Sequence, residues 1–333
     1  MSQLLNSVLS LSAMGLVFGA GLSYASKIFA VEIDPKEEAV LNALPGANCG
    51  GCGFPGCAGL ATAIASGQAP VNACPVGGAP VAEMIAEIMG VSAEAGARKV
   101  AKVLCKGTCE NASNKAEYFG IRDCRAAVIV GNGPKSCEFG CMGFGTCVAV
   151  CPFDAIHINA GGIAEVDTEK CVACGKCVAA CPKQIIEIKP ENKSVIVECI
   201  NKEVGKQVKV NCSVGCIACG ICEKNCKFDA IHVINNVAKI DYDKCTECMV
   251  CTQKCPTKAI SGDLSKRKKA DIVPDLCIGC TICAKNCPVE AITGEVKQVH
   301  VVDKEKCIGC SVCAKKCPKK AINMIQQLPQ ELQ

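Results

Sequence analysis

The sequence predicts an α+β protein built in series: an N-terminal transmembrane helix, a small helical domain and three tandem cysteine-rich units. Three observations predict this order. Residues 2–26 contain no charged side chain. Cysteine makes up 33 of the 333 residues, whereas tryptophan is absent and aromatic residues reach only 3%. The cysteine spacing repeats along the chain, which is typical of tandem copies of one structural unit.

The first 31 residues are predicted to be a membrane anchor. Residues 4–25 are mostly apolar, and a membrane helix needs about 20 such residues. No Lys or Arg precedes Lys27, so the positive-inside rule places the C-terminal side in the cytoplasm. A cleaved signal peptide would carry a basic start and a shorter apolar core. We therefore expect one retained span, residues 1–31, in the cell membrane, with the cysteine-rich part on the cytoplasmic side.

The cysteine pattern argues against a disulfide scaffold. Disulfide-dense chains are typically small secreted domains, whereas this chain is long and its cysteine count is odd. Cysteines two or three residues apart in one loop are better placed to ligate one metal centre than to form a disulfide with each other. The sequence therefore predicts metal-binding thiolates in a reducing compartment.

A small domain is expected over residues 32–104. A short helical linker (34–47) leads into a cysteine motif, a helix-compatible segment covers 58–67, and residues 79–104 have a helical composition. Four cysteines supply the thiolates for one metal centre, namely Cys49, Cys52, Cys57 and Cys74.

The rest of the chain repeats itself. The spacing Cys124-x12-Cys137-x3-Cys141 recurs at Cys199-x12-Cys212-x3-Cys216, but Phe144 stands where the second copy has Cys219. We predict three units, 105–198, 199–264 and 265–333. Each unit is expected to run strand, cysteine loop, short helix, strand. The expected strands lie around Ile156, Val166, Ile186, Val233, Ile240, Ile272 and Val301.

The run Cys-x2-Cys-x2-Cys-x3-Cys-Pro is typical of bacterial ferredoxins, in which the fourth cysteine ligates the other [4Fe–4S] cluster of a pair. Zinc ribbons use pairs of Cys-x2-Cys instead. Five regular triplets with partner cysteines therefore favour iron–sulfur clusters in ferredoxin-like units.

The pairing rule, with Cys137 recruited in place of Phe144, gives seven clusters. Their ligands are Cys49, Cys52, Cys57 and Cys74; Cys137, Cys141, Cys147 and Cys181; Cys171, Cys174, Cys177 and Cys151; Cys216, Cys219, Cys222 and Cys255; Cys245, Cys248, Cys251 and Cys226; Cys277, Cys280, Cys283 and Cys317; and Cys307, Cys310, Cys313 and Cys287.

Five cysteines remain, and four of them could hold an eighth cluster. They are Cys105, Cys109, Cys124, Cys199 and Cys212, with Cys105, Cys109 and Cys124 as the favoured core. The alternative is that some are buried free thiols, which pack as small hydrophobes.

Other chemistries find little support. Gly131 and Gly133 begin like a dinucleotide fingerprint, but Pro134 follows, so direct NAD binding is not expected. The basic run 266–269 lacks interleaved aromatic residues, which disfavours nucleic acid. The three histidines are given no role, and no catalytic residue is predicted.

The apolar helix, the Cys49–Cys74 motif and the serial ferredoxin units together resemble the B subunit of the Rnf complex, in its long clostridial-type version. The resemblance implies an electron-transfer subunit of an ion-translocating ferredoxin:NAD oxidoreductase, a translocase. It implies reduced ferredoxin and the membrane and peripheral subunits of a redox-driven ion pump as partners. The alternative is a polyferredoxin subunit of a carbon monoxide dehydrogenase, formate dehydrogenase or hydrogenase, which would not explain the apolar helix.

The C-terminal unit is the most basic part of the chain. Residues 263–333 carry 12 basic and 8 acidic side chains, a net charge of +4. Ferredoxins of such families are typically acidic, so we expect ferredoxin to dock near residues 263–325 and electrons to run towards the Cys49 cluster. The alternative is that these lysines only keep the unit soluble.

Overall fold

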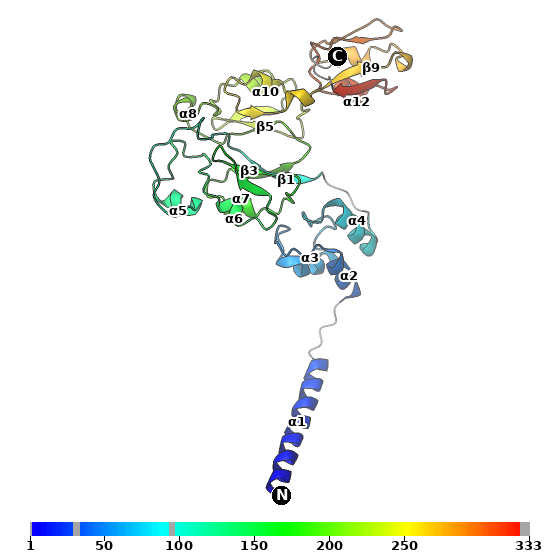
Figure 1. Cartoon of the computed structure of the whole chain (residues 1–333). Helices are drawn as coiled ribbons and strands as arrows, with labels where there is room; N and C mark the ends of the chain where they lie inside the picture. Colours follow the sequence, from blue (N-terminus) through cyan, green and yellow to red (C-terminus); the bar gives the residue numbers. More distant parts are fainter. Residues whose placement is uncertain (1, 29–33, 93–96, 327–333) are drawn as a thin grey trace. The chain divides into compact units, whose positions relative to one another are not determined.

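The structure is a computed structural model that describes residues 2–28, 34–92 and 97–326. The chain divides into two compact units, Met1–Ala95 and Gly96–Gln333 (Figure 1). Residues 29–31 of the predicted anchor and 327–333 of the predicted third unit lie outside the described residues.

The predicted N-terminal helix is present as α1 (Ser2–Ile28). Consecutive large apolar side chains such as Leu16, Val17 and Phe18 are exposed on it. Along the stretches that the structure describes, no helix is at once long enough and apolar enough to cross a membrane. Glycine, serine and Lys27 dilute the apolarity of α1. The transmembrane assignment of this helix is therefore not confirmed.

Three helices form the rest of the first unit: α2 (Pro35–Ala43), α3 (Gly56–Ala65) and α4 (Gly78–Met89). The side chain of Asp34 caps α2 by accepting from the Lys36 N–H at 2.9 Å. Val40, Leu60 and Ile85 are at most 1% exposed and form the core between the helices. The expected helices over 34–47 and 58–67 are thus present.

The helix expected over 79–104 ends much earlier. Gly90, in the left-handed conformation, terminates α4, and Lys99–Val103 forms strand β1. The segment is a strand because it pairs with β4 and buries Val100 and Ala101, which outweighs its helix-compatible composition. These residues belong to the second compact unit, not to the helical domain.

The second unit repeats one motif three times, and each copy contains two antiparallel ribbons. The outer ribbon joins the first strand of a copy to its last: β1 (Lys99–Val103) with β4 (Ile186–Pro190), β5 (Ile196–Val197) with β8 (Ile260–Ser261), and β9 (Lys268–Ile272) with β12 (Ile322–Gln326). The inner ribbon is a hairpin: β2 (Ile156–Ile158) with β3 (Ala164–Val166), β6 (Ile231–Ile234) with β7 (Val237–Ile240), and β10 (Ile292–Thr293) with β11 (Val301–Val302). All seven strands expected from the sequence are present.

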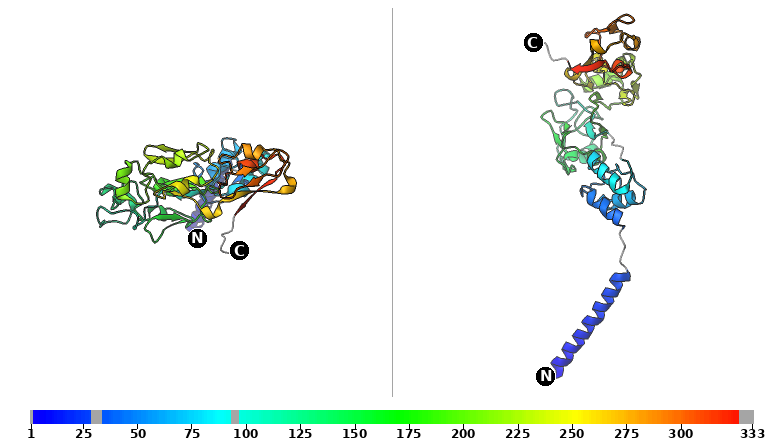
Figure 2. Two further views of the ribbon diagram at one scale, coloured as in Figure 1. Left: turned by 90° about the horizontal axis from the view of Figure 1, so that it is seen from above. Right: turned by 90° about the vertical axis from the view of Figure 1, so that its right-hand side faces the viewer.

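The ribbons bring the ends of each copy together. In the third copy, for example, β9 and β12 lie side by side although about 50 residues separate them. Orange and red segments are adjacent in each view (Figure 2). This closure places the cysteine loops between the outer and the inner ribbon.

Short helices follow the cysteine loops: α6 (Thr146–Ala149), α7 (Lys176–Ala180), α9 (Ile221–Lys224), α10 (Val250–Lys254), α11 (Ile282–Lys285) and α12 (Val312–Lys316). Two further helices, α5 (Cys124–Ile129) in the first copy and α8 (Gly205–Asn211) in the second, precede the first cysteine loop of their copy. Short 3-10 turns, Leu264–Lys266 and Pro274–Leu276, flank β9.

Each regular cysteine loop contains two residues with positive φ, as at Gly309 and Ser311. Successive N–H groups in such alternating turns point into the loop and make an anion-binding concavity. Gly309 is also required for close packing, because a Cβ there would come within 2.1 Å of the Lys268 carbonyl oxygen.

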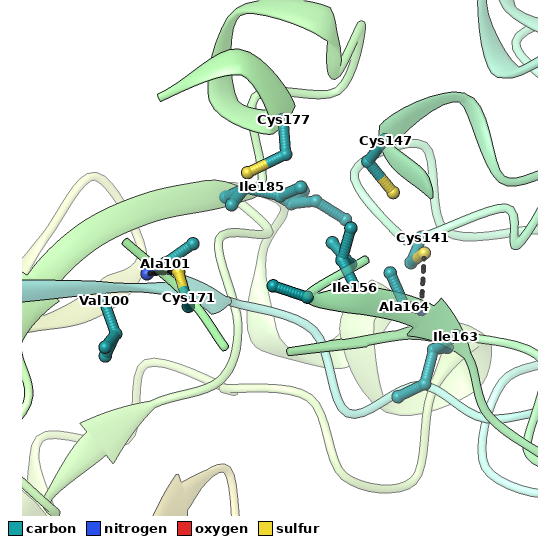
Figure 3. Packing of buried hydrophobic residues seen from close by; sticks show 12 residues of the cluster. Val100, Ala101, Cys141, Cys147, Ile156, Ile163, Ala164, Cys171, Cys177 and Ile185 are labelled. Carbon is teal, nitrogen blue, oxygen red and sulfur yellow. Dashed lines mark hydrogen bonds between the residues drawn. The ribbon is translucent and has the colours of Figure 1, made fainter. Parts of the chain in front are cut away.

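The core of the first copy is built from cysteines and small aliphatic side chains. Ile156 and Ile185 are 2% exposed. In Figure 3 they lie between the sulfur atoms of Cys141 and Cys147 on one side and those of Cys171 and Cys177 on the other. The interior is therefore arranged around two groups of thiols, and Phe153, the aromatic side chain packed against it, is only partly buried.

Candidate metal-cluster sites

Five cavities lie beside the cysteine loops of the second unit. Each of them is lined by four cysteines and otherwise mainly by aliphatic residues and backbone. Cavities that each present four thiols fit one kind of occupant with four thiolate ligands.

Four cavities contain the ligand sets that the pairing rule predicts, including the fourth cysteine from the neighbouring loop. The sets are Cys151, Cys171, Cys174 and Cys177; Cys226, Cys245, Cys248 and Cys251; Cys277, Cys280, Cys283 and Cys317; and Cys287, Cys307, Cys310 and Cys313. In each copy, at least one cysteine loop thus shares its cavity with the fourth cysteine of the neighbouring loop.

Two further predicted groups are recognised by their electrostatics. Burial raises the pKa of Cys222 to about 11, and the neighbouring thiols of Cys216, Cys219 and Cys255 contribute. In the first unit, burial and the thiols of Cys57 and Cys52 raise the pKa of Cys74. Half-buried Cys49 precedes them in the same motif.

The fifth cavity is lined by four cysteines that the sequence did not predict as one site. Its four cysteines are Cys105, Cys137, Cys199 and Cys212, from both the first and the second copy. Burial raises the pKa of Cys137, and the adjacent thiols of Cys105 and Cys212 add to this. We call these four residues the bridging site. Cys137 therefore lies beside Cys105, Cys199 and Cys212, whereas the sequence placed it in the group around Cys141.

Cys124 lies close to Cys141, Cys147 and Cys181, the group to which the sequence assigned Cys137. Its thiol, with those of Cys141 and Cys181, contributes to the burial-driven rise in the pKa of Cys147 to about 12. The backbone N–H of Cys124 donates to Thr146 Oγ at 2.7 Å, which fixes the start of α5 beside α6.

Phe144 explains why the ligand is supplied by another segment. It stands where a regular loop has its second cysteine, and its ring lies 5.1 Å from that of Tyr118, centroid to centroid. The loop that carries Tyr118 continues to Cys124. This segment therefore supplies Cys124 in place of the missing cysteine. Its Tyr118 packs on Phe144, which stands at the position of that cysteine.

Cys109 is the one cysteine left over from these eight groups of four. Its side chain is exposed and packs against the β2–β3 turn, where a Cβ on Gly162 would come within 2.8 Å of its sulfur. The structure does not bring together Cys105, Cys109 and Cys124, the expected core of an eighth cluster, because the three lie in different surroundings.

Backbone donors recur at the fourth cysteine of the sets. The N–H of the alanine four residues later donates to the cysteine sulfur at 3.2 to 3.4 Å. The pairs are Cys151 with Ala155, Cys226 with Ala230, Cys287 with Ala291, and Cys317 with Ala321. Such bonds orient the ligand and stabilise its thiolate form.

Unpartnered polar atoms test whether a cluster fits these cavities. Among the described residues, buried side-chain N or O atoms without a partner occur at Thr246, Arg267 and His300. Leaving one such group unpaired costs about 1–3 kcal/mol. Thr246 and His300 line cysteine cavities, and Arg267 is influenced electrostatically by Cys248, Cys251 and Cys307. Cluster sulfides and thiolates would be acceptors for these donors, so the residues present fit the group.

In the described part of the chain, no three His, Cys, Asp or Glu side chains converge closely enough to hold a single metal ion. Thiolates around one zinc ion would lie within about 4 Å of each other, given Zn–S bonds of about 2.3 Å. The cysteine groups of the described residues therefore line shared cavities, and their side chains are too far apart to ligate one metal ion.

Family comparisons agree with the cysteine geometry. A family described as "Putative Fe-S cluster" matches residues 44–76. Families described as "4Fe-4S dicluster domain" match residues 137–186 and 215–260, 170–230 and 244–291, and 270–324. These matches indicate that the chain holds 4Fe–4S clusters.

Curated relatives cover most of the chain. The B subunit of a Na(+)-translocating ferredoxin:NAD(+) oxidoreductase complex from Acetobacterium woodii is 54% identical over 78% of this chain and 78% of its own length. The B subunit of an ion-translocating oxidoreductase complex from Methanosarcina acetivorans is 42% identical over 78% of this chain and 98% of its own. The B subunit of a proton-translocating ferredoxin:NAD(+) oxidoreductase complex from Clostridium ljungdahlii is 44% identical, covering 77% and 91%.

Substitutions of single cysteines separate the bridging site from its neighbour. Cys137→Ser and Cys212→Ser should each remove the same cluster, about four iron atoms per chain, and the double variant should lose no more than either single one. Cys124→Ser should remove a different cluster, so that Cys124→Ser with Cys137→Ser loses about eight. Iron and acid-labile sulfide analysis of anaerobically purified protein measures this.

Cys109→Ser is the matched control and should keep the full iron content. Additive losses for Cys137→Ser and Cys212→Ser would contradict the bridging site, because they would place the two residues on different clusters.

Proposed function

This chain belongs to the family of B subunits of ion-translocating ferredoxin:NAD(+) oxidoreductase (Rnf) complexes, and we propose that it accepts electrons from reduced ferredoxin and relays them to other subunits. It is an iron–sulfur electron-transfer subunit of an oxidoreductase. The polyferredoxin alternative is not favoured, because the B subunits of three ion-translocating oxidoreductase complexes match 77–78% of the chain.

The observation that carries the proposal is that five of the cysteine sites in residues 97–326 are neighbours in one series. Neighbouring sites are close enough for their thiols to influence one another: Cys105 acts on Cys141, Cys216 on Cys199, Cys222 on Cys251, and Cys248 on Cys310. These four electrostatic interactions join the first copy to the bridging site, the bridging site to the second copy, the two sites of the second copy, and the second copy to the third.

We assign the ligands of eight clusters on this basis. Seven groups lie as follows in residues 97–326, in spatial order from the third copy: Cys277/280/283/317, Cys287/307/310/313, Cys226/245/248/251, Cys216/219/222/255, Cys105/137/199/212, Cys124/141/147/181 and Cys151/171/174/177. Cys49/52/57/74 holds the eighth. Each bound [4Fe–4S] cluster supplies one-electron redox chemistry.

The chain's own residues keep the sites dry and fixed. The cysteines of each copy share their core with buried alanine, valine and isoleucine, so water has little access. Backbone N–H groups and the positive-φ loops stabilise negative charge at the sulfurs. Little rearrangement is then needed when the charge at a site changes.

The third copy is the proposed entry point for electrons. Lys315, Lys316, Lys319 and Lys320 are exposed on α12 and the turn that follows it. Lys319 also lines the cavity of Cys277, Cys280, Cys283 and Cys317. A positive surface next to the last site of the series suits an acidic donor, for which ferredoxin is the family expectation.

The opposite end of the series lies near the start of the second unit in sequence. The cavity of Cys151, Cys171, Cys174 and Cys177 is partly formed by Ala101 of β1, the first strand after the helical unit. Electrons are therefore proposed to leave towards the Cys49 site and the remaining subunits.

Attachment to the membrane is assigned to α1. Leu16, Val17 and Phe18 are 64–75% exposed, and three consecutive positions cover most of the circumference of a helix. A stretch of helix that exposes large apolar side chains around most of its circumference is stabilised by an apolar surrounding. We infer that lipid and membrane subunits provide it, in line with the ion-translocating complexes of the relatives.

Reversing the charge of the entry surface tests the donor site. Lys315, Lys316, Lys319 and Lys320 changed together to Glu should slow reduction by ferredoxin at low salt and flatten its salt dependence, because steering by opposite charge is lost. Stopped-flow reduction kinetics measure both. Reduction by a small neutral donor should be unchanged.

The control has the same change in charge elsewhere: Lys176, Lys202, Lys206 and Lys209, also exposed, changed to Glu. Equal slowing in both variants, or none in the first, would move ferredoxin entry away from the third copy.

Charged substitutions in α1 test membrane attachment. Leu16→Asp, Val17→Asp and Phe18→Asp together should release the chain from isolated membranes, since each charge costs about 2.5–3.5 kcal/mol near the centre of a lipid-buried helix. Immunoblotting of membrane and supernatant fractions measures the release. Phe119→Asp, Ile121→Asp and Ile129→Asp, at exposed positions of the second unit, form the control and should not cause it. Retention of the α1 variant would assign attachment to another surface.

A further inference from the structure

His300 is a buried histidine whose ring has no hydrogen-bond partner. The residue is 2% exposed, and neither Nδ1 nor Nε2 contacts a donor or acceptor within the described residues. A neutral imidazole carries one N–H donor, and such donors are nearly always satisfied when buried. The other two histidines, His157 and His232, lie at the surface near acidic side chains.

The ring lies against a cluster cavity. His300 lines the cavity that also contains Cys277, Cys280, Cys283 and Cys317, and we call this cavity the terminal site. The rest of its wall is mostly aliphatic, including Ile272 and Ile322. Cluster sulfur is therefore the available acceptor for a ring N–H.

Gly294 leaves room for the ring. A Cβ on Gly294 would come within 2.8 Å of His300 Cγ and 2.9 Å of Cδ2. The φ of Gly294 is +153°, which other residues adopt only with strain. The hairpin turn before β11 thus holds the imidazole in one place.

The same position is alanine in the other two copies. Asp167, Asp241 and Asp303 are equivalent, because the N–H of each donates to the carbonyl of the alanine before the inner ribbon. Three residues earlier stand Ala164, Ala238 and His300, which are 4%, 3% and 2% exposed. Only the third copy therefore places a side-chain donor at this point.

Resting on the proposed function, we propose that a ring N–H of His300 donates to a sulfur of the cluster at the terminal site and raises its reduction potential. Reduction adds negative charge to the cluster and its thiolates, so a donor that points at sulfur stabilises the reduced form more than the oxidised form. His300 acts only through this hydrogen bond and does not itself carry electrons. Its effect is to favour reduction at the site where the donor delivers electrons.

Selective ¹⁵N labelling of histidine tests the hydrogen bond in the full chain. The chain has only three histidines, so few positions contribute to the signal. In the partly reduced wild-type protein, pulsed EPR should detect a ¹⁵N hyperfine coupling between one cluster and a histidine. His300→Leu should abolish this coupling, whereas His157→Leu and His232→Leu should retain it.

A redox titration of the same proteins tests the effect on potential. In His300→Leu one cluster should be harder to reduce, with its oxidised-to-reduced ratio at a fixed potential about tenfold higher, as expected for loss of one charge-assisted hydrogen bond. His300→Gln, which keeps an N–H donor, should restore most of the wild-type ratio. Iron content should not change in either variant.

The outcomes distinguish this proposal from the proposed function. Absence of the histidine coupling in the wild-type protein would overturn the role of His300, whether or not the variants fold. Unchanged titration in His300→Leu with full iron content would do the same and leave His300 as a packing residue. Loss of ferredoxin-driven reduction in the wild-type protein would instead contradict the electron-relay function.

Discussion

The structure depends on one constraint: four thiol groups share each buried cavity. Burial, together with a smaller contribution from neighbouring thiols, raises the pKa of Cys147, Cys199 and Cys251 to about 12. Four thiolates therefore cannot share such a space without a positively charged occupant. A metal centre keeps its coordinating thiols ionised, and its binding energy becomes folding energy. With no tryptophan and only 3% aromatic residues, the chain has few other means of filling its interior.

The bridging site turns repeated units into one series. Copies of a two-cluster unit need not be connected, since each closes its own ribbons and its own pair of sites. Here Cys105 and Cys137 from the first copy meet Cys199 and Cys212 from the second in one cavity. The N–H of Cys141, a residue of the adjacent site, donates to the Cys105 sulfur at 3.4 Å. A shared site of this kind both links two copies mechanically and shortens the gap between their clusters.

Local spacing predicts most of the sites, because three cysteines within seven residues occupy one loop whatever surrounds it. The fourth ligand follows from the same rule, since it begins the turn after the adjacent helix. The sequence could not place the isolated cysteines Cys105, Cys124 and Cys137, which depend on tertiary contacts. Alignment of the repeats treated Cys124 and Cys199 as equivalent, yet they line different sites. Strand β1 was missed for the same reason, as its partner β4 lies more than 80 residues away.

Iron-edge anomalous diffraction, or a cryo-electron microscopy map of the chain with its clusters intact, tests the central claim most directly. The account predicts eight compact iron peaks per chain, one of them surrounded by Cys105, Cys137, Cys199 and Cys212, with Cys109 contacting none. Seven peaks with an empty cavity between the first and second copies, or a cluster ligated by Cys109, would contradict it.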